Sequence, residues 1–336
     1  MINFPPLYLD WMNRLLILIL MVCVWITACT GETNPESVML PVSAPTQTFP
    51  ALYLHSDSSV SLPTATQKPK KYSPITPVPT GTSTPTSAPP ISQTESADWK
   101  DLPVIPENID PSLQKVYEKG LALGNDPYAF SIFGDCQERP KDFFGVFETD
   151  AALVESLSPE LREAVDNFRG SFSRESPTAQ DGTTPGALLW SQWHRGEYGC
   201  SFAETPVQCE LRIHRPSFVI IQIGTHFESR NTEYLRKVIL QLLDAGVVPI
   251  LATKADNREK DERINRDMSM LAAEYDLPLW NFWAALSDLP DRGLYVMKGR
   301  EEQGPVYLNE EASVRHRMTG LEALNAVWRA VTDTSR

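Results

Sequence analysis

The pattern of hydrophobic and polar positions divides the chain into three stretches. Residues 15–28 (LLILILMVCVWITA) form one apolar run, and periodicity is almost absent from about residue 30 to residue 96. Beyond residue 100, short apolar runs alternate with segments of helical spacing. The pattern therefore predicts a signal peptide at residues 1–28, a Pro/Ser/Thr-rich disordered tether at 29–100 and one globular domain at 101–336.

Within the domain, the apolar runs have the lengths of strands and the amphipathic segments have the lengths of helices. Strands are predicted at Tyr128–Phe133, Ser217–Ile223, Val247–Ala252 and Leu277–Phe282. Helices are predicted at Pro159–Phe168, Glu233–Ala245, Asp261–Tyr275 and Thr319–Val331. Strands that alternate with helices in this order predict an α/β fold, namely a three-layer α/β/α sandwich with a mostly parallel, flavodoxin-like sheet.

The apolar run near the N-terminus has the features of an export signal. It follows Arg14 and is shorter than the roughly 20 residues that a membrane-spanning helix needs, but it fits a signal-peptide core of about 7–15 residues. The run ends in Ile26-Thr27-Ala28-Cys29, which resembles the bacterial lipobox. We therefore expect an extracytoplasmic protein whose partner is the bacterial cell membrane, reached through a lipid on Cys29. The alternative is a short uncleaved anchor followed by an incidental cysteine.

Composition describes the tether and excludes one class of partner. The stretch TPVPTGTSTPTSAPP at residues 76–90 buries too little apolar surface to offset the entropy of ordering, which predicts an extended, solvated stalk. The chain carries 30 basic and 43 acidic side chains, a net charge of −13. Most of this negative charge lies in the domain, where it repels phosphate backbones, so we expect no nucleic-acid partner.

The domain's cysteines indicate one disulfide. Cys200 and Cys209 flank the polar stretch SFAETPVQ, and outside the cytoplasm such a pair is expected to be bridged. Two free thiols are the alternative, and Cys136 is left without a partner. The chain has no Cys-x-x-Cys pair and no His-x-x-x-His spacing, so neither a metal nor another cofactor is expected.

Polar groups follow the predicted strands. Gly134-Asp135-Cys136, Gly224-Thr225-His226 and Lys254-Ala255-Asp256-Asn257 each come directly after a strand. Ligands of open α/β sheets bind beyond the carboxyl ends of the strands, so these groups mark the expected site. Trp280 and Trp283 are expected in the core rather than on a sugar-stacking surface.

Taken in order, these blocks resemble the SGNH (GDSL-type) hydrolases, especially lipid-anchored bacterial members, over about residues 118–332. The resemblance puts Cys136 at the position of the serine nucleophile, next to Asp135. Gly182 matches the glycine that donates to the oxyanion, and His226 occupies the position of the family's Gly-x-Asn-Asp asparagine. The family's C-terminal Asp-x-x-His is missing, since Ser313 stands three residues before His316. The catalytic blocks are therefore degenerate.

Two interpretations of function follow from the resemblance. One is a cell-surface acyl ester hydrolase (esterase or deacetylase), weakly active, with Cys136 as nucleophile and His226 as base; His194 and His316 are alternative bases. Its partner would be an acylated polysaccharide or a small ester. The other is a catalytically degenerate scaffold that binds a glycan or a protein.

Overall fold

The computed structural model describes residues 98–333. The predicted signal peptide, Cys29 and the predicted tether up to residue 97 lie outside the described residues. The helices are α2 (Ser112–Leu123), α3 (Val146–Thr149), α4 (Ala151–Ser156), α5 (Pro159–Asn167), α6 (Pro206–Ile213), α7 (Asn231–Asp244), α8 (Arg263–Glu274), α9 (Phe282–Ala285) and α10 (Glu310–Thr332). The strands are β1 (Asp126–Gly134), β2 (Pro216–Gln222), β3 (Val248–Ala252), β4 (Leu279–Trp280), β5 (Leu294–Tyr295) and β6 (Tyr307–Leu308).

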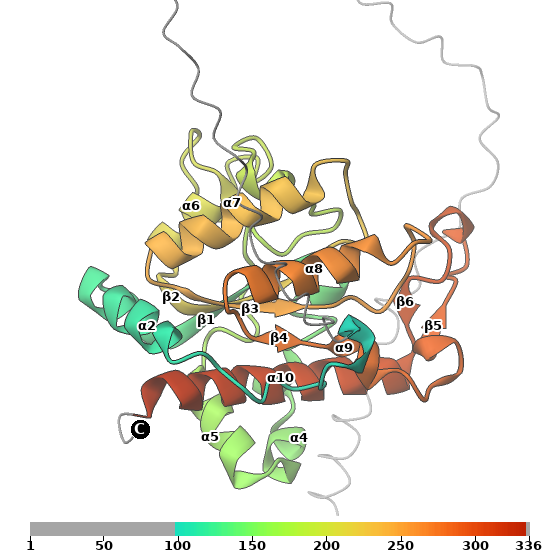
Figure 1. Cartoon of the computed structure of the whole chain (residues 1–336), viewed down its shortest axis with the longest axis horizontal. Helices are drawn as coiled ribbons and strands as arrows, with labels where there is room; N and C mark the ends of the chain where they lie inside the picture. The colour runs from blue at the N-terminus through green and yellow to red at the C-terminus, as the bar shows by residue number, and fades with distance from the viewer. Residues whose placement is uncertain (1–97, 334–336) are drawn as a thin grey trace, which may run out of the picture. The chain divides into compact units, whose positions relative to one another are not determined.

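The main sheet consists of four parallel strands in the order β1-β2-β3-β4. Helices α7 and α8 cover one face, and the long α10 with α5 covers the other, while α2 packs against α10 and the sheet (Figure 1). A separate antiparallel hairpin, β5–β6, lies beyond the end of the sheet near the start of α10. The predicted three-layer α/β/α sandwich with a parallel sheet is confirmed.

Burial of the central strands explains why the sheet forms. Every residue of β2 and β3 is buried, as expected for strands that are covered by helices on both faces. Each fully buried Ile or Phe side chain stabilises the fold by about 1.5–3 kcal/mol relative to an exposed one. The continuous runs at Ser217–Ile223 and Val247–Ala252 are therefore well-defined strands.

An aromatic stack joins α10 to the sheet. His316 is 1% exposed and lies between Phe143, at 4.1 Å between ring centres, and Phe282, at 4.5 Å. Gly320 permits this close approach, because a Cβ there would come within 2.9 Å of Phe143 and of Trp280. Trp280 is fully buried, so its predicted place in the core is confirmed.

Two predicted element boundaries were wrong. The strand predicted at Leu277–Phe282 is reduced to β4, because Asn281 accepts a hydrogen bond from the N–H of Ala284 and starts α9. Helix α10 begins at Glu310 rather than Thr319, where Asn309 caps it through the N–H of Ala312. Trp99 also packs against the domain, since its ring is buried 5.6 Å from that of Trp283.

The predicted disulfide between Cys200 and Cys209 is confirmed. Cys209 lies in the first half of α6 rather than in a loop, so the bond fixes the preceding segment to this helix. Cys136 is the free cysteine of the described part of the chain.

Candidate functional site

Asp135 is the centre of the candidate site. Its carboxyl is buried, and Oδ1 accepts hydrogen bonds from the backbone N–H groups of Cys136 and Gly182, both at 2.7 Å. Its other oxygen, Oδ2, lies 2.5 Å from Nδ1 of His226. One carboxylate therefore connects the three residues that the sequence marks as nucleophile, oxyanion donor and base.

Local sequence explains why Asp135 faces inward. Strand β1 ends at Gly134, and Asp135 then caps the short 3-10 helix Cys136–Glu138. The cap is reciprocal, because the Glu138 carboxylate accepts the N–H of Asp135 at 2.7 Å. Burial raises the pKa of Glu138 well above its usual value, and the charge of Asp135 raises it further.

His226 reaches Asp135 from the loop after β2. Gly224 makes this turn with φ of 137°, in a place where a Cβ would meet Ile264 at 2.3 Å. The hydrogen bond to Asp135 raises the pKa of His226 above its usual value, against the opposing effect of partial burial. Because Asp135 accepts at Nδ1, that nitrogen carries the proton of the neutral ring. Nε2 then remains as an acceptor, which is the tautomer that a general base requires.

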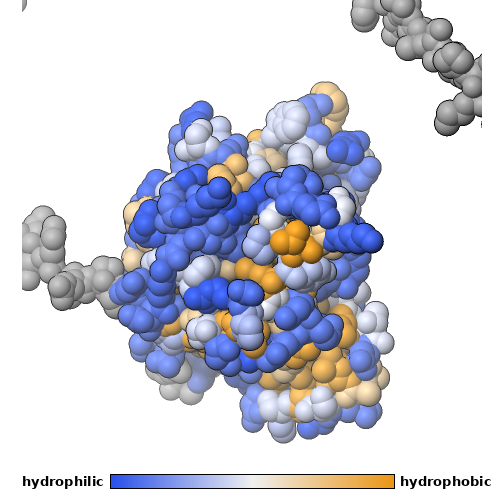
Figure 2. Space-filling model, turned by 90° about the vertical axis from the view of Figure 1, so that its right-hand side faces the viewer, coloured by the Kyte–Doolittle hydropathy of each residue, from blue (hydrophilic) through white to orange (hydrophobic). Residues whose placement is uncertain are grey.

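A pocket of about 460 Å³ holds these groups. Cys136, Gly182 and His226 line one side, and residues of the β5–β6 hairpin and its loop line another, namely Tyr295, Met297, Arg300, Gln303, Tyr307 and Leu308. Figure 2 views the molecule from the side that carries the hairpin in Figure 1, and this surface is mainly hydrophilic with separate hydrophobic areas. The sequence did not predict the hairpin residues, because strands of two residues are too short to show periodicity.

Cys136 is half-buried in this pocket, and its surroundings disfavour the thiolate. Burial raises its pKa strongly, and the charges of Asp135, Glu138 and Asp181 raise it further. Among residues 98–333 its sulfur makes no hydrogen bond to His226, whose Nδ1 is held by Asp135. The expected thiol–imidazole pair is therefore not formed in this structure, although both residues line the same pocket.

The two alternative bases, His194 and His316, do not line the pocket. His194 is buried, with Nε2 on the carbonyl of Glu204 and Nδ1 accepting the N–H of Gly196. His316 is in the aromatic stack, its Nε2 bonded to Gln222, and burial lowers its pKa to about 3. Neither alternative base lines the pocket, whereas His226 lines it together with Cys136.

The polar group after β3, at residues 254–257, forms a network of ion pairs and hydrogen bonds beside the site. Lys254 is almost fully buried and pairs with Asp256 at 2.7 Å and with Glu259 at 2.6 Å. Asp256 also accepts the hydroxyl of Thr225, so it holds neighbouring loops together and does not orient His226. Across residues 98–333, no group of three His, Cys, Asp or Glu side chains is arranged to hold a metal ion.

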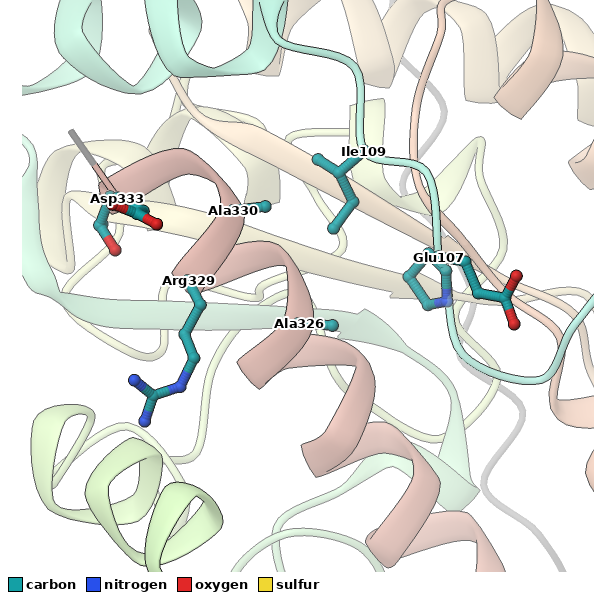
Figure 3. A pocket seen from close by; sticks show the side chains of 8 residues that line it. Glu107, Ile109, Ala326, Arg329, Ala330 and Asp333 are labelled. Carbon is teal, nitrogen blue, oxygen red and sulfur yellow. The ribbon is translucent and has the colours of Figure 1, made fainter. Parts of the chain in front are cut away.

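A further pocket lies between the C-terminal half of α10 and the segment around Glu107 and Ile109 (Figure 3). Arg329 extends from it toward α5 and pairs there with Glu163. Its lining includes no serine, cysteine or histidine.

We compared the chain with protein families, curated proteins and solved structures, and only solved structures are similar to it. No protein-family model matches the chain, and no curated protein matches it. A GDSL-like lipase from Bacteroides thetaiotaomicron is 12% identical, with a TM-score of 0.38 over 64% of this chain and 97% of its own. A putative acylhydrolase from Bacteroides fragilis is 11% identical, with a TM-score of 0.39 over 66% of this chain and 100% of its own. We base the functional assignment on the geometry of the site.

Proposed function

We propose that the chain is a cell-surface lipoprotein whose α/β domain is an SGNH-like acyl ester hydrolase with degenerate catalytic blocks and slow turnover. The observation that carries the proposal is the threefold engagement of Asp135, which binds His226 and the backbone N–H groups of Cys136 and Gly182. Acyl transfer needs a nucleophile, a base and oxyanion donors. Here Asp135 binds the base and the donor N–H groups, so they are not free to act on a substrate.

Each part of that arrangement slows the reaction. An oxyanion hole needs N–H donors directed at the developing charge, but the two N–H groups already donate to a buried carboxylate. A nucleophilic sulfur must be ionised, and the pKa of Cys136 is raised. A histidine base must be neutral, whereas Asp135 favours the charged form of His226. Turnover therefore needs the thiol to ionise and the donors to be released from Asp135.

Two features support the cell-surface location. The Cys200–Cys209 disulfide is typical of oxidising compartments. The apolar run that ends at Cys29 has the length of a signal-peptide core. Within residues 98–333 there is no helix that is both long and apolar enough to cross a bilayer.

Hydrolysis of p-nitrophenyl acetate and butyrate by the full chain in detergent micelles tests the activity. We expect kcat below about 0.01 s⁻¹ at pH 7, against the usual range of roughly 1–10³ s⁻¹, and a steady rise toward pH 9 as the thiol ionises. Cys136→Ala should abolish turnover, and the exposed Ser287→Ala should leave it unchanged. Fast turnover that survives Cys136→Ala would contradict the assignment.

The second candidate is a domain that binds a glycan or protein without catalysis. The raised pKa of Cys136 favours it, because a protonated thiol beside three carboxylates is a poor nucleophile. In that case the Cys136→Ala variant and the wild-type chain would show the same background rate on both esters at pH 9.

A further inference from the structure

A second pocket, of about 600 Å³, borders the candidate catalytic pocket. It lies between Trp283 and the β5–β6 hairpin, and the two pockets share Tyr295 and Gln303. The Gln303 side chain is fixed by the hydroxyl of Tyr307, which donates to it at 2.6 Å. The second pocket is therefore adjacent to the pocket that contains Cys136.

Two guanidinium groups line this pocket without a counter-ion. Arg258 and Arg292 form no ion pair with any carboxylate of residues 98–333, although other arginines do, such as Arg236 with Glu274. Among the lining side chains of the described chain, Asp291 is the acidic one, and it is exposed. The protein as a whole is strongly acidic, but positive charge predominates among the side chains that line this pocket. The pocket therefore favours an anionic ligand.

Neighbouring groups hold the two guanidiniums in place. Arg292 lies over the Trp283 ring, with Cζ 3.7 Å from its centre, and donates to the Trp283 carbonyl at 2.7 Å. Arg258 donates to the carbonyl of Thr225 at 3.4 Å. Burial lowers the pKa of Arg292, and the charge of Glu262, with which it forms no ion pair, offsets this effect only in part. Such pre-organised donors suit bidentate contact with a carboxylate.

The backbone at Arg292 is strained. Asp291 and Arg292 both have left-handed conformations, with φ of 49° and 56°, in a turn that contains Gly293 as well. Each non-glycine residue in this region costs about 1–2 kcal/mol, and strain of this kind concentrates at ligand sites. The strained turn is what brings the guanidinium onto Trp283 and to the pocket wall.

The remaining wall is largely apolar. The hairpin and its loop contribute the side chains of Leu294, Val296, Pro305 and Val306. A mostly apolar pocket with a few fixed polar groups is typical of sites for small organic ligands, and its volume lies in their usual range. The occupant should therefore combine one anionic group with an apolar body.

We propose that this pocket binds the carboxylate of a small organic ligand through Arg258 and Arg292, with the hairpin's apolar side chains against the ligand body. Two sources supply this chemistry, a uronic acid of an acidic polysaccharide and a dicarboxylic acyl chain such as a succinyl group. The inference goes beyond slow ester hydrolysis and does not depend on it, because binding is measured without turnover.

Calorimetric titration of the full chain in detergent micelles tests the proposal with two matched pairs of probes. Methyl glucuronide is compared with methyl glucoside, and monomethyl succinate with methyl butyrate. We expect at least one carboxylate probe to bind at least about tenfold more tightly than its neutral partner, and its affinity to fall as NaCl is raised. The pair that shows the difference identifies the source.

Variants of the two arginines complete the test. Arg258→Gln and Arg292→Gln should each weaken binding of the carboxylate probe about tenfold. Arg292→Lys should weaken it as well, because an ammonium keeps the charge but lacks the planar fork. The exposed Arg266→Gln removes the same charge outside the pocket and should leave affinity unchanged. Thermal melting of each variant shows that it folds. Equal affinity for acidic and neutral probes, no binding of either acidic probe, or variants that bind as the wild type does would overturn the proposal.

Discussion

Nδ1 of His226 lies 2.5 Å from Oδ2 of Asp135, a carboxyl that is only 2% exposed. The His226 side chain is itself 32% exposed and lines the pocket, so a buried carboxyl is paired with an accessible imidazole. An aspartate that holds a histidine in this way fixes both its tautomer and its orientation. The hydrogen bond to Asp135 is also the largest of the effects that shift the pKa of His226.

Asp135→Asn should lower the pKa of His226, because the charged acceptor that raises it is removed. NMR titration of the imidazole signals measures the change. A raised pKa means that the pair stabilises the fold at pH below about 6.5 and that this stabilisation is lost as pH rises through the folded-state pKa. Asp181→Asn removes a carboxylate of the same pocket that does not contact His226, and it should leave the titration unchanged. An unchanged pKa in Asp135→Asn would contradict the pairing.

Cys136 should react slowly with iodoacetamide. Alkylation follows the thiolate fraction, and the raised pKa of Cys136 should make its rate at pH 8 at least about tenfold lower than that of N-acetylcysteine. Mass spectrometry of the Cys136 peptide measures the rate. Asp181→Asn removes one of the three charges that raise the pKa, so it should increase the rate. Rapid labelling at pH 6 that disappears in His226→Ala would instead establish a thiol–imidazole pair.

Loss of the disulfide should destabilise the domain. Replacing both Cys200 and Cys209 by serine should lower the free energy of unfolding by about 2–3 kcal/mol, since the bond restricts the unfolded chain. Urea denaturation monitored by tryptophan fluorescence measures the loss. Cys136→Ser is the matched control, because Cys136 forms no disulfide, and it should shift the free energy by less than about 0.5 kcal/mol. Equal stability of all three proteins would be the contrary result.

His316 should make the fold sensitive to acid. Its pKa is lowered to about 3, so between about pH 6.5 and 3 the unfolded chain binds a proton that the folded chain excludes. Stability should therefore fall with decreasing pH, with a contribution that approaches about 1.4 kcal/mol per pH unit. His316→Gln removes this contribution, and urea midpoints of both proteins from pH 4 to 7 measure it. Glu138, whose raised pKa acts in the opposite direction, is present in both proteins and lies 3.9 Å from Nε2 of His316, so the double variant with Glu138→Gln separates the two contributions. Parallel curves would exclude the effect.

Cys29→Ser should abolish lipid attachment. The Ile26-Thr27-Ala28-Cys29 segment predicts that the wild-type chain incorporates labelled fatty acid and partitions with membranes. Cys23→Ser, a thiol change six residues earlier within the apolar run, should keep the label. Equal labelling of wild type and Cys29→Ser would leave the chain without this anchor.

The sequence predicted those parts of the fold that depend on local periodicity. The runs at Tyr128–Phe133 and Ser217–Ile223 correspond to β1 and β2, because continuous apolar stretches between turn residues have few alternatives in an α/β chain. Strand β4 was predicted too long, since the cap at Asn281 depends on tertiary contacts with the carbonyls of Trp99 and Leu102. Such contacts leave no periodic signal.

The sequence indicated which residues lie at the candidate site, but not the hydrogen bonds between them. The strand ends identified Asp135, Cys136 and His226, because parallel strands bring their carboxyl ends together. That Asp135 would occupy the N–H groups of both Cys136 and Gly182 depends on distances below 3 Å between segments 47 residues apart. Arg258 and Arg292 were missed because their common pocket is created by the hairpin, which the sequence pattern did not predict.

The consecutive order β1-β2-β3-β4 bears on how the chain folds as it emerges, N-terminus first, during synthesis. Each new strand finds its hydrogen-bonding neighbour already present, so the sheet grows in the order of the sequence. Helix α10 is different, because it covers one face of that sheet and arrives last. Until Leu321, Leu324 and Val327 reach the sheet, the apolar face stays open to aggregation and proteolysis. A chain cut short before Glu310 would therefore remain in that vulnerable state.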